Sequence, residues 1–101
     1  MIFYHMTTPE QWAKFEQFDY VEADSLATEG FIHGSYAEQV EGSVRRYFVG
    51  CERVLILKID PDLLTSKLVI ETSRNGELFP HIYGVLNKSA ILDIENRLMP
   101  I

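Results

Sequence analysis

A run of six residues near the middle of the chain, at positions 54–59, is apolar everywhere except at Lys58. A short run rich in branched residues is typical of a strand that is buried on both faces. We therefore expect residues 54–59 to form a central strand of a sheet. The chain has 101 residues, and this length predicts a single domain over residues 1–101.

Strands predominate in the rest of the chain. Aromatic and β-branched residues predict them over residues 2–6, 31–33, 67–71, 82–83 and 90–95. The last segment could also form a helix, but Ile91 and Ile94 favour a strand. Asn75-Gly76 predicts a tight hairpin turn. This pattern, with two or three helices between the strands, predicts an α+β fold rather than parallel βαβ units.

Two capping patterns, led by Thr8 and Ser35, predict where two helices begin. We expect the first helix to bury a stripe formed by Trp12, Phe15 and Phe18. The second helix is expected to end at Gly50, and a single helical turn is expected over residues 24–30.

The net charge of −6 argues against nucleic acid as a partner, because binding a phosphate backbone needs a basic face. The single cysteine, Cys51, excludes an intrachain disulfide and is expected to be a small loop residue rather than a nucleophile. The N-terminus lacks a signal-peptide pattern, and no apolar run approaches the roughly 20 residues of a membrane helix. We therefore expect a cytoplasmic protein without membrane attachment.

The three histidines, His5, His33 and His81, all lie inside apolar or aromatic segments. Histidine is the side chain that most readily gains or loses a proton near neutral pH, so three at semi-buried positions indicate a pocket. Each could instead be a half-buried histidine that bonds a backbone carbonyl. Three histidines could also bind zinc, but no two have helical zinc-motif spacing, so we expect no metal.

Other polar residues extend the candidate site. His33 and Ser35 lie at a strand-to-helix junction, where backbone N–H groups can hold an anion, although Ser35 could serve only as a helix cap. His81 and Tyr83 are two apart on an extended segment and should point the same way. Glu71 ends an apolar strand, where burial would suit acid–base chemistry, and a solvent-facing position is the alternative. Glu77 is its rival for the same role.

Two segments carry a family resemblance: SLxxEGFIHxS at residues 25–35 and FPHIYG at residues 79–84. Together with Gln39, Phe48, Asp60 and Glu71, they resemble the bacterial family called domain of unknown function 952, over nearly the whole chain. That family is grouped by fold with the ADP-ribosyltransferases, which use NAD. The resemblance implies an ADP-ribosylation-like fold, with two packed and mostly antiparallel sheets and a cleft between them.

The resemblance also implies roles for single residues. The segment Tyr4-His5-Met6-Thr7 is similar to the first part of the ADP-ribosyltransferase signature, so His5 would contact a ribose hydroxyl of NAD, with Thr7 beside it. Glu71 would stabilise positive charge on the nicotinamide ribose. The second part of the signature has no direct counterpart, and His33 and Ser35 are its candidates. The cleft would be lined by His5, Ser25, His33, Ser35, Glu71, His81 and Tyr83.

The leading hypothesis is therefore NAD-linked ADP-ribosyl transfer or NAD cleavage, with Glu71 and His33 as the catalytic residues. The alternative is a non-catalytic module that binds a small anionic metabolite or nucleotide in the same cleft, since fold does not carry function with it. A third possibility is an interaction protein that uses exposed aromatic residues. The sequence leaves open whether the protein is an enzyme, and also its oligomeric state.

Overall fold

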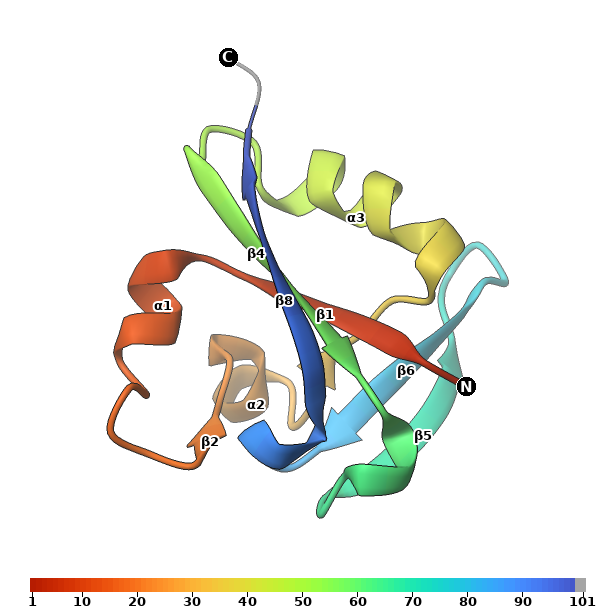
Figure 1. Cartoon of the computed structure of the whole chain (residues 1–101). Helices are drawn as coiled ribbons and strands as arrows, with labels where there is room; N and C mark the ends of the chain where they lie inside the picture. Colours follow the sequence, from red (N-terminus) through yellow and green to blue (C-terminus); the bar gives the residue numbers. More distant parts are fainter. Residues whose placement is uncertain (100–101) are drawn as a thin grey trace.

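The apolar run forms strand β4 (Arg53–Ile59), the middle strand of a sheet with the order β1-β4-β8. Strands β1 (Phe3–Thr7) and β8 (Ile91–Leu98) pair antiparallel with its two sides. The computed structural model describes residues 1–99, and Figure 1 shows β4 between its two neighbours. The predictions of a central strand and of a final strand near residues 90–95 are both confirmed.

Strand β4 is almost wholly apolar because both of its faces are covered. Val54 and Ile56 pack against the helix α3 (Val40–Tyr47). Leu57 and Ile59 belong to a larger core on the other face, formed with residues of the second sheet and the connecting segments. This arrangement explains why the strand lacks the alternation of apolar and polar residues that a half-exposed strand would show.

The second sheet has the order β3-β6-β5 and is also antiparallel. Its strands are β3 (Ile32–His33), β5 (Lys67–Thr72) and β6 (Leu78–Tyr83). The turn between β5 and β6 is closed by the Ser73 N–H, which donates to the Glu77 carbonyl at 2.8 Å, and Gly76 has a φ of +83°. The predicted hairpin at Asn75-Gly76 is confirmed. Glycine suits this turn because it adopts the positive φ that the turn needs.

A third, two-stranded sheet joins β2 (Tyr20–Val21) to β7 (Leu86–Asn87). Within residues 1–99 the α-helices are α1 (Pro9–Ala13), α2 (Asp24–Thr28) and α3, with short 3-10 turns η1 (Ala37–Gln39), η2 (Pro61–Leu63) and η3 (Lys88–Ala90). The α+β class is therefore confirmed, with one small sheet more than expected. No helix in the described part of the chain is long and apolar enough to cross a membrane.

The two larger sheets are joined by a backbone bridge between Tyr4 on β1 and Ser35, just after β3. The Tyr4 N–H donates to the Ser35 carbonyl at 2.7 Å, and the Ser35 N–H donates to the Tyr4 carbonyl at 2.8 Å. Between β3 and the bridge, the Gly34 N–H donates to the Pro80 carbonyl at 2.9 Å. A Cβ atom at Gly34 would lie 2.8 Å from both Phe3 and that carbonyl, so the crossing requires glycine.

Two details of the helices differ from expectation. Thr8 caps α1 as predicted, with its hydroxyl accepting from the Gln11 N–H at 3.1 Å, but α1 ends at Ala13, and Phe18 is 49% exposed rather than part of a buried stripe. Ser35 does not cap the second helix. Its backbone is used in the bridge to β1, so the helical turns begin later, and the Tyr36 N–H donates to the Gln39 side chain instead.

We predict that Leu57→Ala destabilises the fold by about 2–5 kcal/mol, because Leu57 is fully buried and the truncation leaves a cavity in the larger core. Leu92→Ala is the matched control, since Leu92 on β8 is 50% exposed, and it should cost less than about 1 kcal/mol. Urea unfolding followed by circular dichroism measures both free energies. Equal costs for the two variants would contradict the assignment of the core.

Candidate functional site

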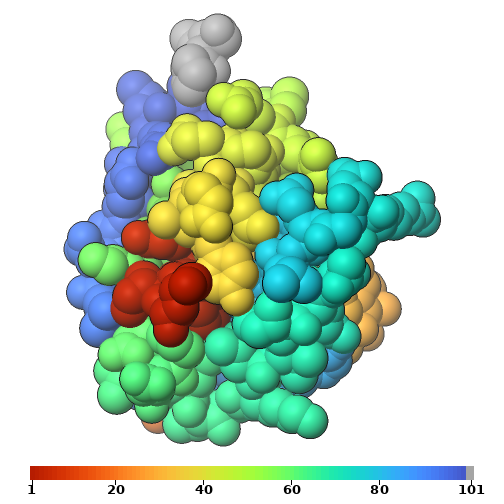
Figure 2. Space-filling model, turned by 90° about the vertical axis from the view of Figure 1, so that its right-hand side faces the viewer, coloured from red at the N-terminus to blue at the C-terminus, as the bar shows by residue number. Residues whose placement is uncertain are grey.

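A pocket of about 790 Å³ opens between α2, α3 and the turn that joins β5 to β6. All three histidines line it. Figure 2 shows the face on which this turn projects from the molecule, next to the segment that leads into α3. Gln39 fixes the turn to that segment, because its side-chain amide donates to the Leu78 carbonyl at 2.8 Å.

His5 lies on β1, with only 7% of its surface exposed. Its Nδ1 lies 2.7 Å from the backbone carbonyl of His33. A carbonyl only accepts, so Nδ1 carries the proton of the neutral ring and Nε2 keeps a lone pair. Burial lowers the pKa of His5 below its ordinary value of 6.5, against a smaller opposing effect of the bond to His33. His5 is therefore neutral at physiological pH and offers Nε2 as an acceptor.

His33 lies at the end of β3, and its Nε2 is 2.8 Å from the carboxylate of Glu29, which follows α2. The two side chains are 54% and 50% exposed. Water competes for both partners at this exposure, so the pair contributes little to stability. The backbone of His33 also takes part in the site, since it pairs with His81 on β6 and its carbonyl accepts from His5.

His81 lies on the central strand β6, with its side chain 14% exposed. Its Nδ1 is 2.7 Å from Oε1 of Glu71 on β5, and the Tyr83 hydroxyl donates to the same oxygen at 2.5 Å. The hydrogen bonds from Tyr83 and then His81 lower the pKa of Glu71, and the same contact raises the pKa of Tyr83. Glu71 is thus held as an ionised acceptor for two neighbours.

Phe31 covers this group, although sequence reasoning did not single it out. Its ring stacks on His81, with centroids 4.0 Å apart and planes at 17°. It also contacts Tyr83, with centroids 5.3 Å apart. The signal that could have found it is its place directly before Ile32 and His33 in the FIHxS segment.

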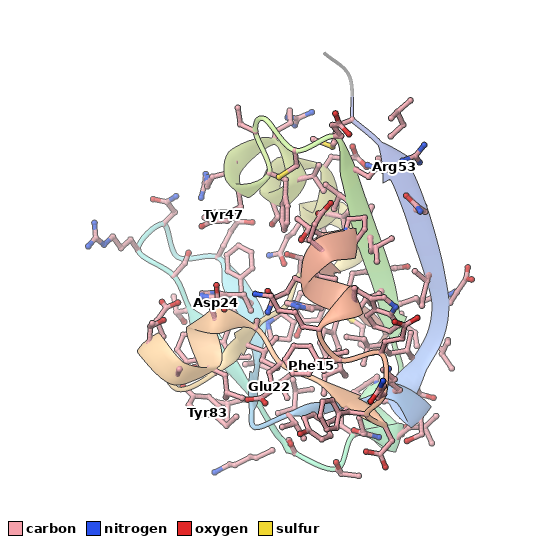
Figure 3. All side chains as sticks on the ribbon, turned by 90° about the vertical axis from the view of Figure 1, so that its left-hand side faces the viewer. Phe15, Glu22, Asp24, Tyr47, Arg53 and Tyr83 are labelled. Atoms are coloured by element: carbon pink, nitrogen blue, oxygen red, sulfur yellow. The ribbon has the colours of Figure 1, made fainter. Side chains whose placement is uncertain are left out.

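The predicted site residues divide into two groups. Those that line the pocket are His5, Ser25, His33, Ser35 and His81. Thr7, Glu71 and Tyr83 are not among the residues that line it, although the expected cleft included Glu71 and Tyr83. Tyr83 shares a face with His81 and contacts Phe31, and Figure 3 shows it beside α2, away from Tyr47 on α3. Glu71 is hydrogen-bonded to Nδ1 of the His81 ring from outside the set of residues that line the pocket.

Glu77, the rival of Glu71, does line the pocket, and it lies 3.3 Å from the side-chain amide of Gln39. Glu71 pairs with Phe79 across the β5–β6 ladder, whereas Glu77 belongs to the turn that overhangs the pocket. The position of the turn beside the start of α3 depends on contacts distant in sequence, such as the bond from Gln39 to the Leu78 carbonyl. The choice between the two carboxylates could therefore not be made from the chain alone.

Three further residues of the pocket wall were missed, and they lie on one side of α3 and its entry. Gln39, Ser43 and Arg46 all line the pocket. Their spacing of four and then three residues is that of one helical face, so a polar stripe distinct from the apolar stripe of Val40 and Val44 was the available signal. Ser43 also bonds the Ser35 hydroxyl at 2.9 Å, which ties the helix to the bridge between the sheets.

Two cations and three carboxylates surround the opening. Arg46 on α3 and Arg74 in the β5–β6 turn line the pocket, and neither forms an ion pair within residues 1–99. The carboxylates belong to Glu29, Glu38 and Glu77. The wall therefore offers charge of both signs, which suits a ligand that carries both anionic and cationic groups.

Ser25 on α2 adds an unusual polar atom to the wall. Its hydroxyl oxygen is buried and has no hydrogen-bond partner within the described residues. Buried polar atoms without a partner are uncommon, so the Ser25 hydroxyl is a candidate contact for a ligand.

No metal site is evident in the described part of the chain. No group of three histidine, cysteine, aspartate or glutamate side chains in residues 1–99 is arranged to hold a metal ion.

Comparisons with known proteins agree with this fold. The family model described as "Protein of unknown function (DUF952)" matches residues 6–94. An X-ray structure of protein CC0527 from Caulobacter crescentus has a TM-score of 0.87 and 26% identity, covering 95% of this chain and 85% of that one. Its solution NMR structure has a TM-score of 0.76 and 24% identity, covering 98% and 86%. No curated protein matches the chain.

We predict that His5 makes folding stability depend on pH. Because the pKa of His5 is lowered in the folded state, the unfolded chain takes up a proton first as the pH falls below 6.5, and stability is lost there. The loss should not exceed about 1.4 kcal/mol per pH unit. His5→Asn keeps a donor for the His33 carbonyl but cannot titrate.

The free energy of unfolding, measured for both proteins between pH 5.5 and 8, tests this dependence. The stability of the native protein relative to His5→Asn should be constant at the alkaline end and decline toward pH 5.5. A difference that stays constant over the whole range would contradict a buried neutral His5.

Proposed function

This chain belongs to the DUF952 family, and we propose that its pocket binds a nucleotide or a similar small anionic metabolite. The observation that carries the proposal is the state of His5, which is buried at the pocket wall with Nδ1 committed to the His33 carbonyl. Within residues 1–99 no group bonds its Nε2. A neutral imidazole acceptor held in this way suits a ligand hydroxyl, such as that of a ribose.

The two arginines supply the anion-binding part of the proposal. A guanidinium recognises phosphate through paired N–H donors, and Arg46 and Arg74 approach the pocket from different elements. The hydroxyl of Ser25 would gain a partner from the same ligand. The pocket volume of about 790 Å³ lies in the range of small-molecule sites, roughly 300–1,000 Å³.

NAD is the nucleotide that we propose to test first. It carries ribose hydroxyls and phosphates together with a cationic nicotinamide ring, and the pocket wall combines His5 and Arg46 with the carboxylate of Glu77. The resemblance to ADP-ribosyltransferases gives the same candidate. The two antiparallel sheets, joined beside the pocket, support an ADP-ribosyltransferase-like fold as part of this hypothesis.

NAD cleavage or ADP-ribosyl transfer is the second candidate function, and the position of Glu77 favours it. In such a reaction the bond between nicotinamide and ribose breaks, nicotinamide leaves with the bonding electrons, and the ribose develops positive charge. A carboxylate beside that ribose stabilises the charge. Since Glu77 lines the pocket and Glu71 does not, the proposal assigns this role to Glu77.

We predict that NAD and ADP-ribose bind at millimolar or lower concentration, and that Arg46→Ala weakens binding about 10- to 100-fold through loss of a charged hydrogen bond to phosphate. Arg45→Ala is the matched control, because Arg45 is the exposed neighbour on α3 that does not line the pocket. Isothermal calorimetry measures both. Absence of heat with either ligand, or equal losses in the two variants, would contradict nucleotide binding in this pocket.

We predict that catalysis, if NAD is the substrate, appears as nicotinamide release over hours and is lost in Glu77→Gln, which preserves the size of the side chain but removes its charge. Glu52→Gln, an exposed carboxylate away from the pocket, serves as the control. Chromatography of the reaction mixture measures nicotinamide. Binding without release would favour the non-catalytic module, and release unchanged by Glu77→Gln would exclude Glu77 as the stabilising group.

A further inference from the structure

We propose that Glu71 is a positioning residue, which holds the His81 ring so that its Nε2 accepts a proton from a hydroxyl group of the ligand. The inference rests on the proposed function, because it requires a hydroxyl-bearing ligand in the pocket. It gives a role to Glu71, which lies outside the pocket, and to His81, whose ring is held by a hydrogen bond and by contacts with two other rings.

The first support is the geometry at Nδ1 of His81. Glu71 lies on β5 diagonally across from His81, because it pairs with Phe79 while His81 pairs with Val69. Its Oε1 accepts from His81 at 2.7 Å and from the Tyr83 hydroxyl at 2.5 Å. An ionised carboxylate has no proton to donate, so Nδ1 carries a proton, and in the neutral form of the ring Nε2 is the nitrogen with the lone pair.

The second support is the restraint on the ring itself. Phe31 stacks on one face of the His81 imidazole at a centroid distance of 4.0 Å. The edge contact with His33, at 5.3 Å and 79°, limits the ring from another direction. With Nδ1 bonded to Glu71 and a side chain only 14% exposed, a flip of the ring would break the carboxylate bond. Nε2 has no hydrogen-bond partner within residues 1–99, and His81 lines the pocket, so the proposal places the ligand hydroxyl at this nitrogen.

The other histidine–glutamate pair is more exposed, although the His33 ring also contacts Phe31 at a centroid distance of 4.9 Å. His33 and Glu29 are about half exposed, whereas His81 is largely covered. The partner of Glu29 is a single ring nitrogen, whereas Glu71 is itself held by Tyr83. A carboxylate that orients a neighbouring imidazole is effective only if both groups are held in place, so the role falls to Glu71 and His81.

The chemical step is a proton transfer. The O–H bond of the ligand hydroxyl breaks, a new N–H bond forms at Nε2 of His81, and the electron pair remains on the ligand oxygen. The imidazolium that results lies beside the negative charge of Glu71, which stabilises it without taking its proton. Loss of Glu71 would leave the ring free to carry its proton on Nε2, which cannot then accept.

The tautomer of His81 tests the positioning role without any ligand. Long-range ¹H–¹⁵N spectra of the full-length, ¹⁵N-labelled protein at pH 8 distinguish a protonated Nδ1 from a protonated Nε2. In the native protein and in Tyr83→Phe, His81 should carry its proton on Nδ1. Glu71→Ala should shift the proton predominantly to Nε2, and Glu29→Ala, the matched control at His33, should leave His81 unchanged.

Two results would overturn the inference: an Nε2-protonated His81 in the native protein, or a tautomer that Glu71→Ala leaves unaltered. A second arm adds ADP-ribose to the native protein, and the ¹⁵N resonance of Nε2 should shift as a hydroxyl donates to its lone pair. Binding that leaves this resonance unchanged would overturn the proton-acceptor role. Failure of ADP-ribose to bind would count against the proposed nucleotide ligand, while the tautomer result would still decide the role of Glu71.

Discussion

The two hydrogen bonds between Tyr4 and Ser35 are the contact on which the geometry of the pocket depends. They bring an edge of the first sheet against the segment that leaves the second, so that His5 reaches the His33 carbonyl. The same contact directs the Ser35 hydroxyl to Ser43 on α3. Paired backbone hydrogen bonds of this kind fix which residues of the two segments lie opposite each other. The pocket is therefore built on a junction, not on a single element.

The histidines of this junction are not equivalent. His5 is buried and neutral, with its tautomer set by a carbonyl. His81 is largely covered, with the proton on its Nδ1 set by Glu71, and His33 is about half exposed beside Glu29. Three copies of one side chain thus lie in three different environments within one pocket, because burial and the identity of the bonded partner differ at each position.

Much of the fold could be predicted from local patterns, because periodicity and turn chemistry are written within a few residues. The central strand around Leu57 and the hairpin at Gly76 are examples. Several of the departures from expectation share one cause. The bridge that takes Ser35 from its expected capping role and the turn that places Glu77 over the pocket depend on partners distant in sequence. The position of Glu71 outside the pocket has the same cause, since it depends on the register of β5 against β6.

Pro80, whose carbonyl accepts from Gly34, stands in the middle strand of its sheet and has no N–H to return the bond. Gly34 and Pro80 therefore share one backbone hydrogen bond instead of the usual two, and the ladder between β3 and β6 ends at His33. The chain therefore leaves β6 after Gly34, and Ser35 pairs with Tyr4 of the other sheet. The missing N–H of Pro80 thus marks the point at which the chain crosses from the second sheet to the first.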